Sequence, residues 1–149
     1  MTKKKILFIT EVMTANWAFE RELWLLKDTH ECFITECLDD ARERVESGVD
    51  KVVMFPFLIA YPNYEFNINP QIEVKFGMGY CFWKQELEKR NIPTIIVNIY
   101  DIHHSYIDEA MTRIMKNNWA TDSNVTFFGK YPEMKDSRRL VELIKKGKK

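Results

Sequence analysis

The spacing of apolar and polar residues predicts short strands that alternate with helices. Mostly apolar runs of strand length occur at 5–9, 32–35, 52–55, 93–98 and 125–128. Apolar residues recur at helical spacing between and after them, at 15–27, 41–47, 80–90, 105–118 and 137–146. Strands that are apolar throughout are buried on both faces, as in a parallel sheet covered by helices. We therefore expect one α/β domain over 1–149, with the three-layer flavodoxin-like (βα)5 arrangement and a five-stranded parallel sheet in the order 2-1-3-4-5.

Several local signals predict where the helices begin, which side they bury and where they end. The first helix should bury Trp17, Ala18, Leu23, Trp24 and Leu26, and the third should bury Phe82, Trp83 and Leu87. Asp39 and Asp40 are typical of a helix start, and Gly48 is expected to end that helix in the left-handed conformation.

The residue at the carboxyl end of the central strand at 52–55 bears directly on function. Ligands and chemistry gather beyond the carboxyl ends of the strands in an open α/β sheet. The strand ends here on Phe55, and Pro56 stops the pairing. A hydrocarbon side chain therefore stands where an acid or a nucleophile would carry chemistry.

An insertion at 56–78 interrupts the regular alternation. It joins the third strand to the third helix through more than the ~2–6 residues usual for such connections, and it carries Tyr61, Tyr64, Phe66 and Phe76. A segment so rich in aromatic residues is not expected to remain in water. We expect it to fold back over the carboxyl edge of the sheet, either as a packed insert or as a functional lid.

Charge and cysteine content narrow the class of protein. The 22 basic residues are balanced by 22 acidic ones, which argues against nucleic acid as the main partner. We interpret the lysines at 3–5 and in the tail at 145–149 as solvated chain ends. The three cysteines form no CxxC pair, which indicates reduced thiols and a cytoplasmic protein. No apolar run approaches the ~18 residues of a membrane span, so we expect no membrane partner.

Several phrases of the chain resemble a response-regulator receiver domain. The segments that carry the resemblance are KILFITE at 5–11, DKVVMF at 50–55, GYCFWKQEL at 79–87, IPTIIVN at 92–98 and FFGKYP at 127–132. It covers nearly the whole chain once 56–78 is treated as an insertion. It implies the (βα)5 fold and places the family's phosphorylation site at the carboxyl edge of the sheet.

The resemblance also implies that this site is degenerate. Phe55 occupies the phosphoacceptor position, and Thr10 replaces one of the two metal-binding acids, so that Glu11 alone remains. Asn98 replaces the switch hydroxyl, whereas Lys130 matches the family's lysine. One carboxylate beside a phenyl ring is a poor site for Mg²⁺. We therefore expect no phosphorylation, no metal and no cofactor.

An enzyme at the same edge is a second possibility. Polar groups expected near the ends of the first, fourth and fifth strands are Glu11, Asn98, Asp101, His103, His104 and Lys130. A carboxylate, an imidazole and a lysine together can perform acid–base work. The structural alternative is that Glu11 and Lys130 form an ion pair, Asp101 caps a turn and one histidine caps a helix. No spacing between a nucleophile and a base is visible.

A third hypothesis concerns the segment at 73–80, EVKFGMGY. An acid followed by glycines ahead of a helix is similar to nucleoside deoxyribosyltransferase-like folds, in which a glutamate attacks a sugar. This resemblance implies a small-molecule or nucleotide-binding enzyme with Glu73 as its nucleophile. Helix entry explains Gly77 and Gly79 equally well.

The competing class is an interaction module. Receiver-like domains without the aspartate keep the fold and use the face around helices four and five to dimerise or to dock partners. The residues that this resemblance places there are Met111, Met115, Trp119, Phe127, Tyr131 and Met134. Methionine and aromatic side chains make adaptable contact surfaces. We therefore expect a signalling module that binds a protein partner or forms a homodimer without catalysis, although a small molecule at the sheet edge stays open.

Overall fold

The computed structural model describes residues 3–10, 19–55, 58–62, 72–76, 82–99, 124–131 and 133–146. The predicted helix at 105–118 lies outside these ranges. None of the helices that they contain is long and apolar enough to cross a membrane.

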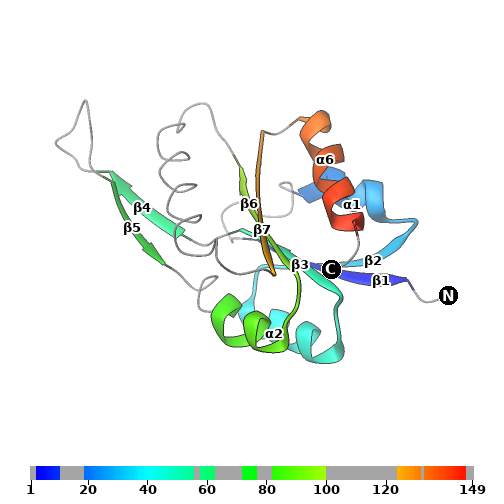
Figure 1. Ribbon diagram of the computed structural model, residues 1–149, viewed down its shortest axis with the longest axis horizontal. Coiled ribbons are helices and arrows are strands. Elements are labelled where there is room, and N and C mark those ends of the chain that lie inside the picture. Colours follow the sequence, from blue (N-terminus) through cyan, green and yellow to red (C-terminus); the bar gives the residue numbers. More distant parts are fainter. Residues whose placement is uncertain are drawn as a thin grey trace.

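A five-stranded parallel sheet forms the centre of the protein (Figure 1). Its strands are β1 (Lys4–Ile9), β2 (His30–Thr35), β3 (Lys51–Met54), β6 (Thr94–Ile99) and β7 (Val125–Lys130). Their spatial order is β2-β1-β3-β6-β7, and every neighbouring pair is parallel. The flavodoxin-like order 2-1-3-4-5 predicted from the apolar runs is therefore confirmed.

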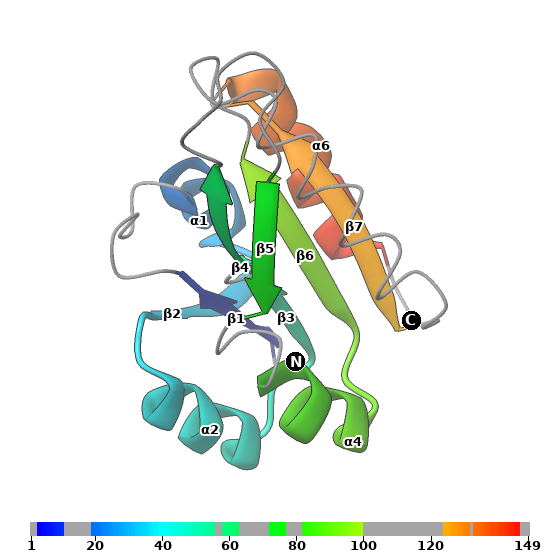
Figure 2. The same cartoon turned by 90° about the vertical axis from the view of Figure 1, so that its left-hand side faces the viewer.

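Helices cover both faces of this sheet (Figures 1 and 2). One face carries α1 (Glu20–Leu26) and α6 (Met134–Lys145), and the other carries α2 (Leu38–Ser47) with the continuous helix of η2 (Trp83–Leu87) and α4 (Glu88–Arg90). The η2 turn is a π-helix in which the Glu88 N–H donates to the Trp83 carbonyl. Phe82, Trp83 and Leu87 are buried, as predicted.

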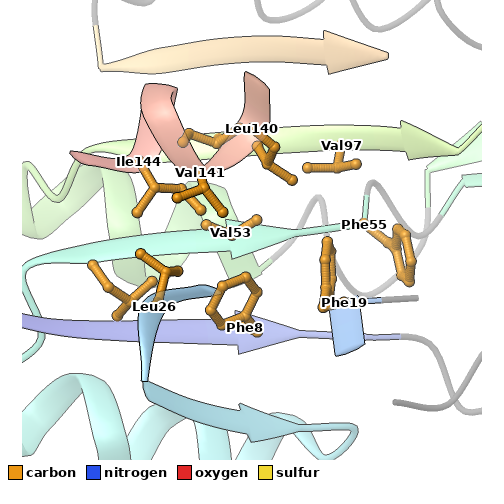
Figure 3. Packing of buried hydrophobic residues seen from close by; sticks show 11 residues of the cluster. Phe8, Phe19, Leu26, Val53, Phe55, Val97, Leu140, Val141 and Ile144 are labelled. Carbon is orange, nitrogen blue, oxygen red and sulfur yellow. The ribbon is translucent and has the colours of Figure 1, made fainter. Parts of the chain in front are cut away.

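The alternation of side chains along the strands divides the core into two clusters. Even-numbered residues of β1, such as Phe8, face α1 and α6, whereas odd-numbered ones, such as Leu7, face α2 and η2. Figure 3 shows the first cluster, in which Val53 of β3 packs between Phe8 and the α6 residues Leu140 and Val141. Burial of both sheet faces explains the apolar residues on both sides of the central strands β1, β3 and β6.

The predicted ends of α2 are confirmed in part. The helix ends at Ser47 as predicted but begins at Leu38 rather than at Asp39, after a turn in which the Cys37 N–H donates a 3.1 Å hydrogen bond to the Thr35 hydroxyl. Gly48 does end the helix with a positive φ of 106°, but its ψ of 113° is far from the left-handed helical value.

The inward face of α1 also differs from the prediction. Leu26 is fully buried, as predicted, but Trp24 is 67% exposed, and Phe19, which the prediction omitted, is fully buried. Positions 19 and 26 are seven residues apart, which places them on one side of a helix, and position 24 lies on another side. Trp17 and Ala18 lie outside the described residues.

The insertion contains two strands that the sequence analysis treated as loop. β4 (Leu58–Pro62) and β5 (Ile72–Phe76) pair antiparallel as a separate two-stranded sheet. In Figure 1 they extend from the carboxyl end of β3 away from the main sheet. Residues 63–71 lie outside the described ranges, so coverage of the sheet edge by the insertion stays a prediction.

Candidate functional site

The carboxyl edge of the sheet brings together four of the five residues that the receiver resemblance singled out, and the fifth, Glu11, lies outside the described residues. Thr10 follows β1 and Phe55 follows β3, and the Phe55 N–H donates a 3.2 Å hydrogen bond to the Ile9 carbonyl. Asn98 and Lys130 lie near the ends of the adjacent strands β6 and β7. All four of these residues are buried, with Thr10 fully inaccessible and Phe55 only 5% exposed.

Aromatic rings fill the region around Phe55. The Phe55 ring stacks on Phe19 with 5.1 Å between ring centroids, and Phe19 in turn meets Phe8 at 5.0 Å. Figure 3 shows Phe19 and Phe55 side by side just beyond the ends of the strands. Phe55 is therefore one member of an aromatic stack that continues into the core.

Lys130 is held by a carboxylate from the first helix. Its Nζ lies 2.5 Å from an oxygen of Glu22, and the side chains of these two residues are 4% and 0% exposed. The same Nζ lies 5.7 Å from the centroid of the Phe19 ring, within the range of a cation–π contact. The lysine is thus bound to α1 by charge and by its contact with the aromatic stack.

Glu22 is a partner of Lys130 that the sequence did not point to. The ion pair between Glu11 and Lys130, expected as one alternative, stays a prediction, because Glu11 lies outside the described residues. Glu22 was missed because an acid inside an amphipathic helix normally faces solvent. A signal existed in the spacing, since Phe19, Glu22 and Leu26 share one side of the helix.

Burial makes the Glu22–Lys130 pair sensitive to loss of either partner. Removing two charges from water is costly, and their mutual attraction offsets this cost only while both are present. Glu22 Oε1 and Thr10 Oγ1 are buried and have no hydrogen-bond partner within the described part of the chain. The position of the Glu22 carboxylate in the core therefore depends on the contact of its other oxygen with Lys130.

The other candidate residues for chemistry are not assembled within the described residues. Asp101, His103 and His104 lie outside them, as do Gly77 and Gly79. Glu73 lies in β5, opposite Tyr61 of β4, rather than in a loop before a helix. In the ranges that the structure describes, no three His, Cys, Asp or Glu residues are grouped so that they could hold a metal ion.

The predicted interaction face is described at three of its six residues. Tyr131 and Met134 are 46% and 39% exposed and flank the turn between β7 and α6. Phe127 instead packs partly buried against the core on the α2 side. Met111, Met115 and Trp119 lie outside the described residues.

Asp136 shapes the turn that presents Tyr131 and Met134. Its buried carboxylate accepts a 2.8 Å hydrogen bond from the Tyr131 N–H and one of 3.0 Å from Arg139. The backbone hydrogen bond and then Arg139 hold the pKa of Asp136 below its usual value, despite the opposing effect of burial. The ionised Asp136 carboxylate therefore fixes the backbone at Tyr131, beside the exposed side chains of Tyr131 and Met134.

Comparisons of the chain with known protein families and with curated proteins found no match.

Separate and joint removal of the Glu22–Lys130 pair should affect stability differently. We expect Glu22→Leu and Lys130→Met each to cost about 3–5 kcal/mol, because each removes one charge of a buried ion pair and leaves the other charge buried. The double variant should recover most of that loss, since apolar side chains of similar volume tolerate the site. Urea unfolding of all four proteins gives the coupling free energy.

The exposed pair Lys27 and Asp28, 3.4 Å apart, is the matched control. Asp28→Asn should change the free energy of unfolding by less than about 1 kcal/mol. A double variant as unstable as the sum of the two single variants would contradict the proposed coupling.

The Asp136 carboxylate should make stability depend on acid pH. Its pKa is lower in the folded protein than in the unfolded chain, so its contribution is present above the unfolded value and is lost as pH falls through the folded value. We expect Asp136→Asn to cost about 1–3 kcal/mol near neutral pH and progressively less below about pH 4. Urea unfolding across this range measures the difference.

Arg139→Gln separates the effect of Arg139 on the Asp136 pKa from that of the Tyr131 N–H. It should keep part of the acid dependence, because the hydrogen bond from the Tyr131 N–H, the largest single cause of the lowered Asp136 pKa, remains. A difference between Asp136→Asn and the unchanged protein that stays constant with pH would refute the assignment.

Proposed function

We propose that this protein is a receiver-like module that acts by binding a protein partner or a second copy of itself, without phosphorylation. The observation that carries the proposal is the filled carboxyl edge. Phe55 lies stacked on Phe19 at the position that the resemblance gives to the phosphoacceptor, and Lys130 is bound to Glu22. A phosphoryl group would find neither a carboxylate at position 55 nor a lysine free of an anionic partner.

The arrangement of Lys130 supports this reading on physical grounds. A lysine that stabilises an incoming anion has to offer its charge to that anion. Here the charge already faces a carboxylate in a site closed to water, and withdrawing it would leave Glu22 buried and unpaired. The same contacts that stabilise the fold therefore oppose phosphate binding.

The exposed apolar side chains support a binding role. Tyr131 and Met134 lie close in sequence at the β7–α6 turn, and the turn is ordered by Asp136. Tyrosine is enriched at the energetic centres of protein interfaces, and methionine adapts to varied partners. A preordered turn also lowers the entropy lost on binding.

A phosphate mimic should leave the protein unchanged. We expect acetyl phosphate or beryllofluoride with Mg²⁺ to cause no specific shifts in the NMR spectrum of the native protein, because position 55 offers no oxygen. Phe55→Asp should also remain unlabelled, since Thr10 still leaves the metal site without its second acid. Saturable shifts around Phe55 in the native protein would overturn the proposal, whether or not the variant folds.

Self-association should depend on the exposed pair at the β7–α6 turn. If a second copy is the partner, Tyr131→Ser with Met134→Ser should weaken the dimer at least about tenfold in sedimentation equilibrium. Trp119→Ser tests the rest of the predicted face. Trp24→Ser is the matched control, because Trp24 is an exposed apolar side chain on another helix.

An unchanged dimer in the Tyr131 and Met134 variant would exclude this face. A native protein that is strictly monomeric would leave a different protein as the partner, and the same variant should then lose that partner in a direct binding measurement.

A further inference from the structure

Basic residues from four separate elements meet at the amino edge of the sheet, opposite the Phe55 edge. Lys4 begins β1, His30 begins β2, Lys51 begins β3 and Lys145 ends α6. We refer to these four residues as the amino-edge cluster. The two lysine runs near the ends of the sequence, interpreted above as solvated, thus contribute to one surface.

The strand register places three of these side chains on the same face. Lys4 is paired with His30, and Lys51 is paired with Ile6, whose side chain belongs to the core beneath α6. Because paired residues of a parallel sheet point to the same side, Lys4, His30 and Lys51 share the α6 face. Lys51 Nζ donates hydrogen bonds of 2.9 and 3.2 Å to the carbonyls of Ile144 and Lys146, which brings the end of α6 to the cluster.

The same alternation directs the acids at the starts of β2 and β3 to the opposite face. Glu31 is paired with Lys5, and both share the strand parity of the residues that face α2. Asp50 precedes β3 with that parity as well, and its carboxylate accepts a 2.8 Å hydrogen bond from the Lys5 N–H. Glu31, Asp50 and Lys5 therefore share the α2 face, whereas the three strand residues of the amino-edge cluster lie on the α6 face.

The electrostatics agree with this sorting. Burial, followed by the charges of Lys145, Lys51 and Lys4, lowers the pKa of His30. Burial and the charge of Lys4 likewise lower the pKa of Lys51. Lys51 has a structural role, because a cation at the end of α6 complements the helix dipole. Lys4 and Lys145 are exposed, and their positive charges add to that of Lys51 at the same site.

We infer that the amino-edge cluster is a docking site for an acidic segment of a partner protein. This inference rests on the proposed binding function and names the chemistry of the partner. A run of Asp and Glu residues supplies separate carboxylates, and separate flexible ammonium groups match them as single charges.

The composition of the cluster favours this occupant over other anions. It contains no arginine, whose planar fork suits bidentate contacts to phosphate. Strong binding to a nucleic acid backbone uses about 6–10 phosphate contacts, more than this cluster offers, and the chain has no net positive charge to attract a polyanion.

Fluorescence anisotropy with a labelled glutamate-rich peptide tests the inference on the full chain. We expect the peptide to bind in a salt-dependent manner and a glutamine-rich peptide not to bind. Lys4→Gln with Lys145→Gln should weaken binding at least about tenfold. Lys89→Gln with Lys135→Gln is the matched control, because both lysines are exposed and lie on other parts of the surface; it should change binding by less than about twofold.

Two further measurements separate docking from a purely structural role. NMR should show the His30 ring pKa rising when the peptide binds, because nearby carboxylates favour the protonated ring. The Lys4 and Lys145 variant should unfold at a temperature no lower than that of the native protein, since the removed charges repel each other. Loss of binding together with a lower unfolding temperature in this variant would indicate a folding role and overturn the inference.

Other outcomes also decide the matter. Equal weakening by both double variants, or no peptide binding by the native protein, would overturn the inference. Tighter binding of a single-stranded oligonucleotide or of phosphatidylserine vesicles would assign the cluster to a different partner. Sedimentation and the phosphate mimic address the proposed function separately, so this surface can fail while that proposal stands.

Discussion

The buried pair of Glu22 and Lys130 is the contact on which the carboxyl edge depends. It joins the first helix to the last strand across nearly the whole sequence, and the Phe19 ring beneath it stacks on Phe55. A buried ion pair adds little net stability to a fold, because desolvation of the two charges offsets their attraction. Removing one partner is nevertheless strongly destabilising, since the other charge stays buried. That property makes the pair a constraint on function, because any ligand that takes Lys130 leaves Glu22 unpaired.

The two edges of the sheet differ in chemistry for the same geometrical reason. Strand alternation directs Phe55 toward the aromatic stack at one edge and Lys51 toward the end of α6 at the other. The carboxyl edge is the usual ligand site of this fold, and here it is filled by hydrocarbon and an internal ion pair. Surface charge remains at the amino edge, where Lys4 and Lys145 are exposed. The fold alone therefore does not fix which edge of the sheet binds a ligand, as expected of an architecture that hosts many functions.

The sequence predicted the sheet well because the relevant signal is local. The run at 52–55 is apolar at every position because both faces of its strand are covered, and five mostly apolar runs separated by helices leave few topologies. Helix ends were less predictable, since α2 begins at Leu38, before the start expected at Asp39. The partner of Lys130 could not be found from spacing alone, because Glu22 is 108 positions away in sequence and acids are usually exposed.

Charge runs near the ends of a chain illustrate a further limit of sequence reasoning. Lys4 and Lys145 look like solvated lysines when each is considered with its neighbours. Their shared location follows from the strand order and from the antiparallel course of α6, which returns the end of the helix to the start of β3. Like charges placed together by the fold oppose its stability, so their retention on one face is more readily explained by an anionic partner than by folding. Lys51 differs from Lys4 and Lys145 in this respect. Its hydrogen bonds to the end of α6 give it a role in stabilising the fold, so its position needs no anionic partner as an explanation.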